Sequence, residues 1–330
     1  MIPKLYTLLT ASALALLAAF PADKALAQDY RWFKVELLVF TNQAPPAPQG
    51  AASAEQWDAT PELAYPLATR FLVDPARVAR NEARYAGNSL IDEYGRQIIT
   101  ITSGTGGGQI QAPTPVIPEP APVETGDALP RPFVTLADGY REFSGKASAL
   151  QRSGRHSVLF HEAWVQAVGP EANSLPIVLD HSGDEQQWPP LQGTIKIYLT
   201  RYLHLETNLW LNTAGDYLPG TWKMPAPPFG PPSLIIEEDD VVDIAAAIES
   251  LPAADSTAPE ADAAAVGEAA VIEEAQGPVY PYRHAVLLEQ TRRMRSGETH
   301  YIDHPLLGVI IRFTPVSGEE LAAIAASQTI

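Results

Sequence analysis

The stretch GTIKIYLTRYLHLETNLWL, Gly193–Leu211, decides how the rest of the chain is interpreted, because it alternates in character residue by residue. Odd positions from Ile195 to Leu211 are mostly leucine and isoleucine, whereas even positions from Lys196 to Trp210 mix rings with hydrogen-bonding groups. Successive side chains of a β-strand point to opposite faces. The pattern therefore predicts one long strand with one face in the core.

The polar face of this strand carries Tyr198, Tyr202, His204 and Trp210. One interpretation is a solvated sheet face, since strands favour aromatic residues. The other is a platform for a sugar or a peptide, with rings beside hydrogen-bonding groups. Arg201 stands on the apolar face, where an unpaired guanidinium is costly to bury. We therefore expect a salt bridge from Arg201, for example to Glu36 or Glu162.

Further patterns predict the partners of this strand. Apolar and aromatic runs predict four more strands, and residues 136–150 place apolar side chains at helical spacing. Together they predict an α+β fold with a mainly antiparallel sheet and one packed helix. The predicted strands are Trp32–Phe40, His156–Gln166, Arg283–Met294 and His304–Phe313.

Long Pro-, Gly- and Ala-rich insertions interrupt these pieces at about 43–54, 103–130 and 219–277. Such compositions are typical of extended or disordered linkers. The outer pieces are too short to fold alone, and the chain has no cysteine to crosslink them. We expect one discontinuous domain over 28–316, followed by a C-terminal tail at 317–330.

The N-terminus has the pattern of an export signal. Lys4 precedes an apolar run over 5–20, and small residues stand at Ala25 and Ala27. This predicts a signal peptide over 1–27, cleaved after Ala27, and a periplasmic protein without an integral membrane segment. An uncleaved anchor is the alternative, although the run is shorter than the roughly 20 residues of a spanning helix.

The net charge of −17 is mostly local. Residues 231–277 contain twelve acidic residues and no Lys or Arg, and without these twelve the net charge falls to −5. A basic patch elsewhere is therefore permitted. Nucleic acid is not an expected partner, because the basic cluster Arg292–Arg295 is too short for an electrostatic footprint.

The stretch RRMRSGETHYIDHPLLGVIIRF, Arg292–Phe313, raises the question of a metal or catalytic site, because His300 and His304 stand four apart. In an extended chain these histidines lie about 13 Å apart, too far to share one ion. No serine elbow, phosphate loop or dinucleotide glycine pattern is present in the sequence. We expect no enzyme, no metal and no cofactor.

Several blocks together resemble the CsiV family of periplasmic proteins of Gram-negative bacteria. They are FKVELLVF, LFHEAWVQ, GTIKIYLTRYLHLETNLWL and RRMRSGETHYIDHPLLGVIIRF, which occur in this order along the chain. The resemblance implies an exported, non-enzymatic, peptidoglycan-binding protein. It also implies support of cell-wall synthesis or cell division together with a penicillin-binding protein and its lipoprotein activator.

The residues themselves indicate which groups contact the wall. Arginines form bidentate pairs with the carboxylates of peptide stems, and tyrosine or tryptophan rings cover sugars. The alternative is an envelope adaptor that docks another protein and does not bind the wall directly. The predicted binding residues are Arg292, Arg293, Arg295, Tyr202, His204, Trp210 and His300.

Overall fold

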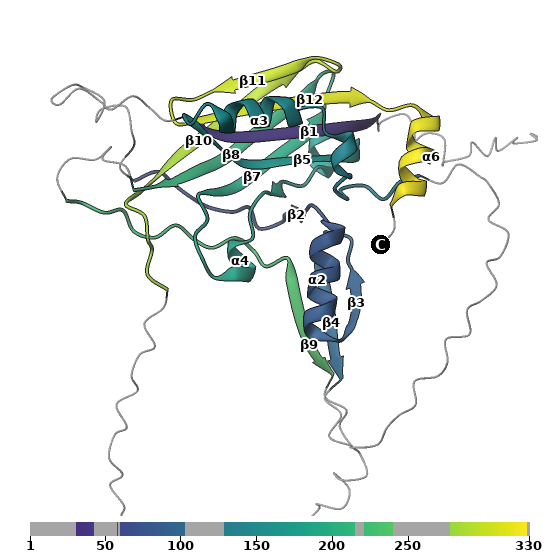
Figure 1. Ribbon diagram of the computed structural model, residues 1–330, viewed down its shortest axis with the longest axis horizontal. Coiled ribbons are helices and arrows are strands. Elements are labelled where there is room, and N and C mark those ends of the chain that lie inside the picture. The colour runs from purple at the N-terminus through teal and green to yellow at the C-terminus, as the bar shows by residue number, and fades with distance from the viewer. Residues whose placement is uncertain are drawn as a thin grey trace, which may run out of the picture.

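A computed structural model describes residues 31–42, 58, 60–102, 129–214, 221–239 and 278–328. Two sheets dominate these residues (Figure 1). Sheet A has the order β11 (Thr299–Asp303), β12 (Leu307–Pro315), β1 (Arg31–Asn42) and β5 (His156–Val168). Sheet B has the order β10 (His284–Met294), β8 (Leu203–Thr213), β7 (Leu191–Leu199), β6 (Ile177–Val178) and β2 (Arg70–Phe71).

The two sheets pack face to face around the main core. Sheet A contributes Val35 and Leu37 of β1, and sheet B contributes Leu205 and Leu209 of β8, all 0% exposed. Alternating apolar residues on each strand supply these inner faces, so the hydrophobic pattern of the sequence determines which side of each strand is buried. Each sheet thus keeps one outer face.

The stretch predicted as one long strand is a β-hairpin. Strands β7 and β8 pair antiparallel, with Leu199 opposite Leu203, and residues 200–202 form the turn. A three-residue connection between paired positions keeps odd residues on one face and even residues on the other. The alternation therefore runs through the turn without a break, and no glycine, proline or asparagine marks the reversal.

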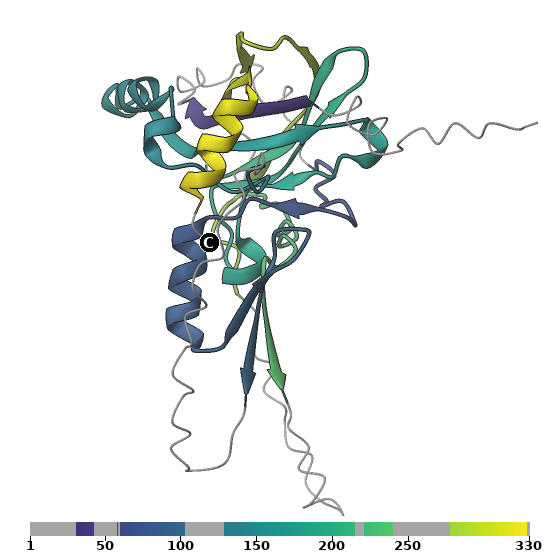
Figure 2. The ribbon, with the colours of Figure 1, turned by 90° about the vertical axis from the view of Figure 1, so that its right-hand side faces the viewer.

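Helices cover the outer face of sheet A. Phe143 and Ala147, at and within helix α3 (Ser144–Arg152), pack on Leu38 and Phe40 of β1. Beside them, η2 (Asp138–Tyr140) and α6 (Gly318–Ser327) lie over the β5 side of the sheet (Figure 2). Residues after 316, expected to be a tail, thus form a helix with Leu321 and Ile324 buried.

A small lobe projects from the sandwich (Figures 1 and 2). It consists of α2 (Pro75–Tyr85), β3 (Asn88–Ile91), β4 (Gln97–Thr102) and β9 (Leu234–Asp239), and β4 and β9 pair in parallel. At its base, Asp184 of α4 (Ser182–Glu185) binds Arg77 of α2 at 2.9 Å and accepts hydrogen bonds from the backbone N–H groups of Ser233 and Leu234. η3 (Glu171–Asn173) follows β5.

The predicted α+β class with mainly antiparallel sheets is confirmed. The described residues contain four α-helices, where the sequence predicts one packed helix. Part of the insertion at 219–277 is ordered, because β9 pairs with β4 and Met224 is buried. The predicted signal peptide and the insertion at 43–54 lie outside the described residues. None of the helices described is both long and apolar enough to span a bilayer.

Candidate functional site

The outer face of sheet B carries the even-numbered side chains of β7 and β8. Its end near the β7–β8 turn is exposed at Arg201, Tyr202 and Arg293. The strand register arranges its side chains in rows that run across β10, β8 and β7. These rows are, in order from the turn of the hairpin, Arg293–His204–Tyr198, Thr291–Glu206–Lys196, Glu289–Asn208–Thr194 and Leu287–Trp210–Gln192.

The row nearest the hairpin turn forms a cationic cluster around Tyr202. The guanidinium carbon of Arg293 lies 4.5 Å from the centroid of the Tyr202 ring, and that of Arg201 lies 5.6 Å from it. Within the described part of the chain, neither arginine has a carboxylate within 4.0 Å. We call Arg201, Tyr202 and Arg293 the arginine cluster. The ring contacts hold both cations without neutralising them.

Behind the arginine cluster, Tyr198 and His204 form a stacked pair. Their ring centroids are 5.0 Å apart and the rings are 5° from parallel. Lys196 Nζ lies 5.4 Å from the Tyr198 ring centroid, and the Tyr198 hydroxyl donates to Glu206 Oε1 at 3.0 Å. Burial, together with the bond to Glu206, raises the pKa of Tyr198 to about 12. The phenol therefore stays protonated and donates to the Glu206 carboxylate.

A groove of about 480 Å³ continues from this pair along the face. Most of its lining residues are polar, and they include both signs of charge. Among the lining residues are Pro66, Lys196, Glu206, Asn208, Glu289 and Thr291. At its far end, Asn208 Nδ2 donates to the backbone oxygen of Ala64 at 3.1 Å, so the segment with Pro66 closes the groove.

Of the predicted binding residues, three come together here: Arg293, Tyr202 and His204. Arg292 is exposed but lies on the opposite side of β10, where its Nε donates to Gln290 Oε1 at 3.2 Å. Arg295 and His300 lie at the turn between β10 and β11, and a ring nitrogen of His300 contacts the Arg295 backbone at 3.0 Å. These two residues stabilise a chain reversal.

Trp210 corrects the prediction of an exposed aromatic face. Its side chain is 0% exposed and its Nε1 donates to Gln192 Oε1 at 3.2 Å. The ring of Tyr65 packs on it at 5.0 Å between centroids, because residues 60–66 cross this end of the sheet. The even-numbered face is therefore core at one end and open at the other, a difference that alternation alone does not encode.

The salt bridge predicted from Arg201 to Glu36 or Glu162 is not formed. Arg201 lies in the hairpin turn and is exposed, so its guanidinium needs no buried partner. Glu36 instead accepts hydrogen bonds from His161 and from the backbone at the start of α3, and Glu162 pairs with Arg141 at 2.7 Å.

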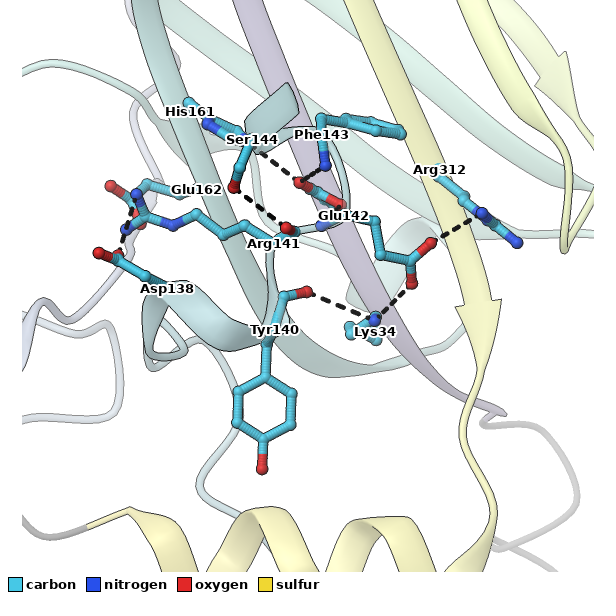
Figure 3. Close-up of polar contacts among 11 residues, drawn as sticks. Lys34, Asp138, Tyr140, Arg141, Glu142, Phe143, Ser144, His161, Glu162 and Arg312 are labelled. Atoms are coloured by element: carbon cyan, nitrogen blue, oxygen red, sulfur yellow. Dashed lines mark hydrogen bonds and ion pairs between the residues drawn. The ribbon is translucent and has the colours of Figure 1, made fainter. Parts of the chain in front are cut away.

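These two carboxylates belong to a paired network beside sheet A (Figure 3). Glu36 is 2% exposed and accepts from the N–H groups of Glu142 and Phe143 at 2.8 and 2.7 Å. Glu142 in turn binds Lys34 at 2.7 Å and Arg312 at 2.8 Å. Since each charge already has a partner, this network fastens α3 to the sheet and has little capacity left for a ligand.

The three charged residues of the groove, Lys196, Glu206 and Glu289, were not predicted as site residues. Lys196 and Glu206 stand on the polar face of the stretch quoted above, so the face assignment contained the signal for them. Glu289 reaches the face only through pairing of β10 with β8, which places it opposite Asn208. In the described part of the chain, no group of three or more acidic, histidine or cysteine side chains is arranged to hold a metal ion.

The described residues thus define a β-sandwich in which helices cover the outer face of sheet A. The outer face of sheet B is open at one end, where it presents unpaired arginines beside a polar groove. The chain belongs to the CsiV family of peptidoglycan-binding proteins, whose family model matches residues 8–316. No curated protein and no solved structure matches the chain. The family description names peptidoglycan as the ligand.

Proposed function

We propose that this protein binds peptidoglycan in the periplasm through the outer face of sheet B. The observation that carries the proposal is the arginine cluster, because two exposed guanidiniums contact one ring and have no carboxylate partner in the described part of the chain. Peptidoglycan stems carry free carboxylates, which guanidinium groups bind through charge-assisted hydrogen bonds. The polar groove next to the cluster offers further donors and acceptors for the same ligand.

Sedimentation with purified sacculi tests this proposal. We expect the wild-type protein to pellet with sacculi, and the double variant Arg201→Ala, Arg293→Ala to remain largely in the supernatant. The matched control is Arg80→Ala, Arg84→Ala, which removes the same charge from exposed positions of α2 in the lobe. Wild-type protein that stays in the supernatant contradicts the proposal. Equal loss of binding in both double variants shows that binding depends on net charge and not on the arginine cluster.

The wider role follows from the family resemblance: support of cell-wall synthesis or division together with a penicillin-binding protein and its lipoprotein activator. Crosslinking in living cells, with a photoreactive residue at an exposed site, tests this part. We expect an adduct with a component of the synthesis machinery in addition to adducts with the wall. Recovery of wall adducts alone contradicts this wider role while leaving wall binding intact.

The adaptor alternative is favoured by one feature, the free edge of sheet B. Strand β10 pairs only with β8, and Val286–Met294 form no further backbone–backbone hydrogen bond within the described part of the chain. Such an edge is a template for an added strand from a partner. A dominant protein adduct at β10, with no sedimentation on purified sacculi, is the result that distinguishes the adaptor from the wall-binding protein.

A further inference from the structure

The rings on the outer face of sheet B are already engaged by other side chains. Tyr198 is 6% exposed, with His204 stacked on it and Lys196 beside it. Tyr202 is 44% exposed, but two guanidiniums lie over its ring. Trp210 is buried beneath Tyr65. A sugar binds a protein ring through the flat face of that ring, and on this surface those faces already contact cations or other rings.

The rings therefore position charge on this surface. A guanidinium above a tyrosine keeps its full charge and its hydrogen-bond donors, and it loses rotamer freedom before any ligand arrives. Arg293 and Arg201 are held in this way at the end of the groove. Such a pair is suited to a carboxylate and offers nothing specific to a neutral N-acetylated sugar.

The groove supplies the opposite charge at a fixed spacing. Glu206 lies one row from Arg293 and Glu289 lies two rows from it. Along the strand direction, the backbone of Glu206 is therefore about 7 Å from that of Arg293, and the backbone of Glu289 is about 14 Å from it. Lys196 and Thr291 flank Glu206 in the same row. The face thus presents cations at one end and carboxylates further along, which complements a ligand that carries both carboxylate and ammonium groups.

We infer that the outer face of sheet B recognises the peptide stem of peptidoglycan and not its glycan strand. The arginine cluster binds stem carboxylates, and Glu206 and Glu289 bind the free ammonium group that an uncrosslinked diamino acid carries. This inference rests on the proposed function and specifies which part of the wall is read. It predicts a preference for uncrosslinked stems, because crosslinking consumes the ammonium group.

Competition for sacculi separates the two parts of the ligand. An amidase cuts peptidoglycan into glycan strands and stem peptides, and each pool is added to protein bound to intact sacculi. We expect the stem peptides to displace the wild-type protein at a concentration at least tenfold lower than the glycan strands, counted as repeat units. Equal displacement, or displacement by glycan alone, overturns the inference. Failure of the protein to bind intact sacculi is a different result and overturns the proposed function.

Modified stem tripeptides assign the residues. Amidation of the carboxylates is expected to weaken wild-type binding about tenfold, and Arg293→Ala to abolish that sensitivity. N-acetylation of the side-chain amine of the diamino acid is expected to weaken wild-type binding several-fold. The double variant Glu206→Gln, Glu289→Gln is expected to abolish that sensitivity. Arg80→Ala keeps both sensitivities. If both site variants still discriminate as the wild type does, the stem is read elsewhere and the assignment is wrong. Circular dichroism of each variant confirms that it is folded.

Discussion

The outer faces of the two sheets carry similar charged residues in opposite states. Beside sheet A, Lys34, Arg141 and Arg312 each bind a carboxylate within 2.8 Å, next to the start of helix α3. On sheet B, Arg201 and Arg293 contact a ring and, in the described part of the chain, no carboxylate. Charge that is paired beside a helix start fastens the helix to the sheet, whereas unpaired, exposed charge costs little to the fold and remains available to a ligand.

The sharpest test of this comparison uses the two ends of β8. Trp210 is fully buried and Tyr202 is 44% exposed, although both were predicted to lie on one binding face. Trp210→Ala is expected to lower the free energy of unfolding by about 3–5 kcal/mol, because it leaves a cavity beneath Tyr65. Tyr202→Ala is expected to change it by less than about 1 kcal/mol. Urea unfolding measures both, and equal effects contradict the division of this face.

The second comparison removes one carboxylate from the outer face of each sheet and measures the change in the free energy of unfolding. Glu36→Ala leaves two backbone N–H groups and His161 without their acceptor inside the protein. We expect it to lower the free energy of unfolding by about 3 kcal/mol. Glu289→Ala, at an exposed position of sheet B, is the matched control and is expected to stay within about 0.5 kcal/mol of the wild type. A stable Glu36→Ala variant contradicts the fastening role of the network.

Asp184 extends the comparison to the joint between sandwich and lobe. Burial raises the pKa of Asp184, but the neighbouring His181, whose Nδ1 lies 3.7 Å from the carboxylate, and hydrogen bonds from Ser233 and Leu234 outweigh this and hold it at about 2. Because the folded pKa lies below the unfolded value near 3.8, the bonds stabilise the fold above pH 4, and this contribution is lost as the pH falls toward 2. It amounts to about 2 kcal/mol at neutral pH.

The variant Asp184→Asn isolates this contribution. At pH 6 we expect the free energy of unfolding of the wild type to exceed that of the variant by about 2 kcal/mol. At pH 3 we expect this difference to be about 1 kcal/mol smaller than at pH 6. Urea unfolding at the two pH values measures the difference. A gap that is independent of pH shows that packing at this position, and not its charge, joins the lobe to the sandwich.

Particular residues show which parts of the fold and of the site could be predicted from the sequence. Apolar and aromatic runs identified the strands β1, β5, β10 and β12. Alternation identified the inner face of β8, because burial on one side imposes a period of two. It missed the hairpin turn, whose three residues preserve that period. It missed α2 because only Val78 of that helix is buried, although Asp74 caps it and Pro75 begins it. Which end of the outer face is covered depends on residues 60–66, far away in the sequence.

The smallest expected effect concerns the ring that holds the arginine cluster. Tyr202→Leu removes the aromatic face under Arg293 and Arg201 but keeps an apolar side chain, so the charge of the cluster is unchanged. An exposed cation–π contact contributes about 0.5–1 kcal/mol, which corresponds to about a two- to fivefold loss of affinity for sacculi.

Tyr202→Phe is the matched control, because it keeps the ring and removes only the hydroxyl. We expect its affinity for sacculi to equal that of the wild type. If the Tyr202 hydroxyl instead contacts a sugar, Tyr202→Phe lowers this affinity. Quantitative sedimentation at several protein concentrations resolves a twofold change. If leucine and phenylalanine bind equally well, the ring does not orient the arginines, and the contrast between the two faces reduces to exposure alone.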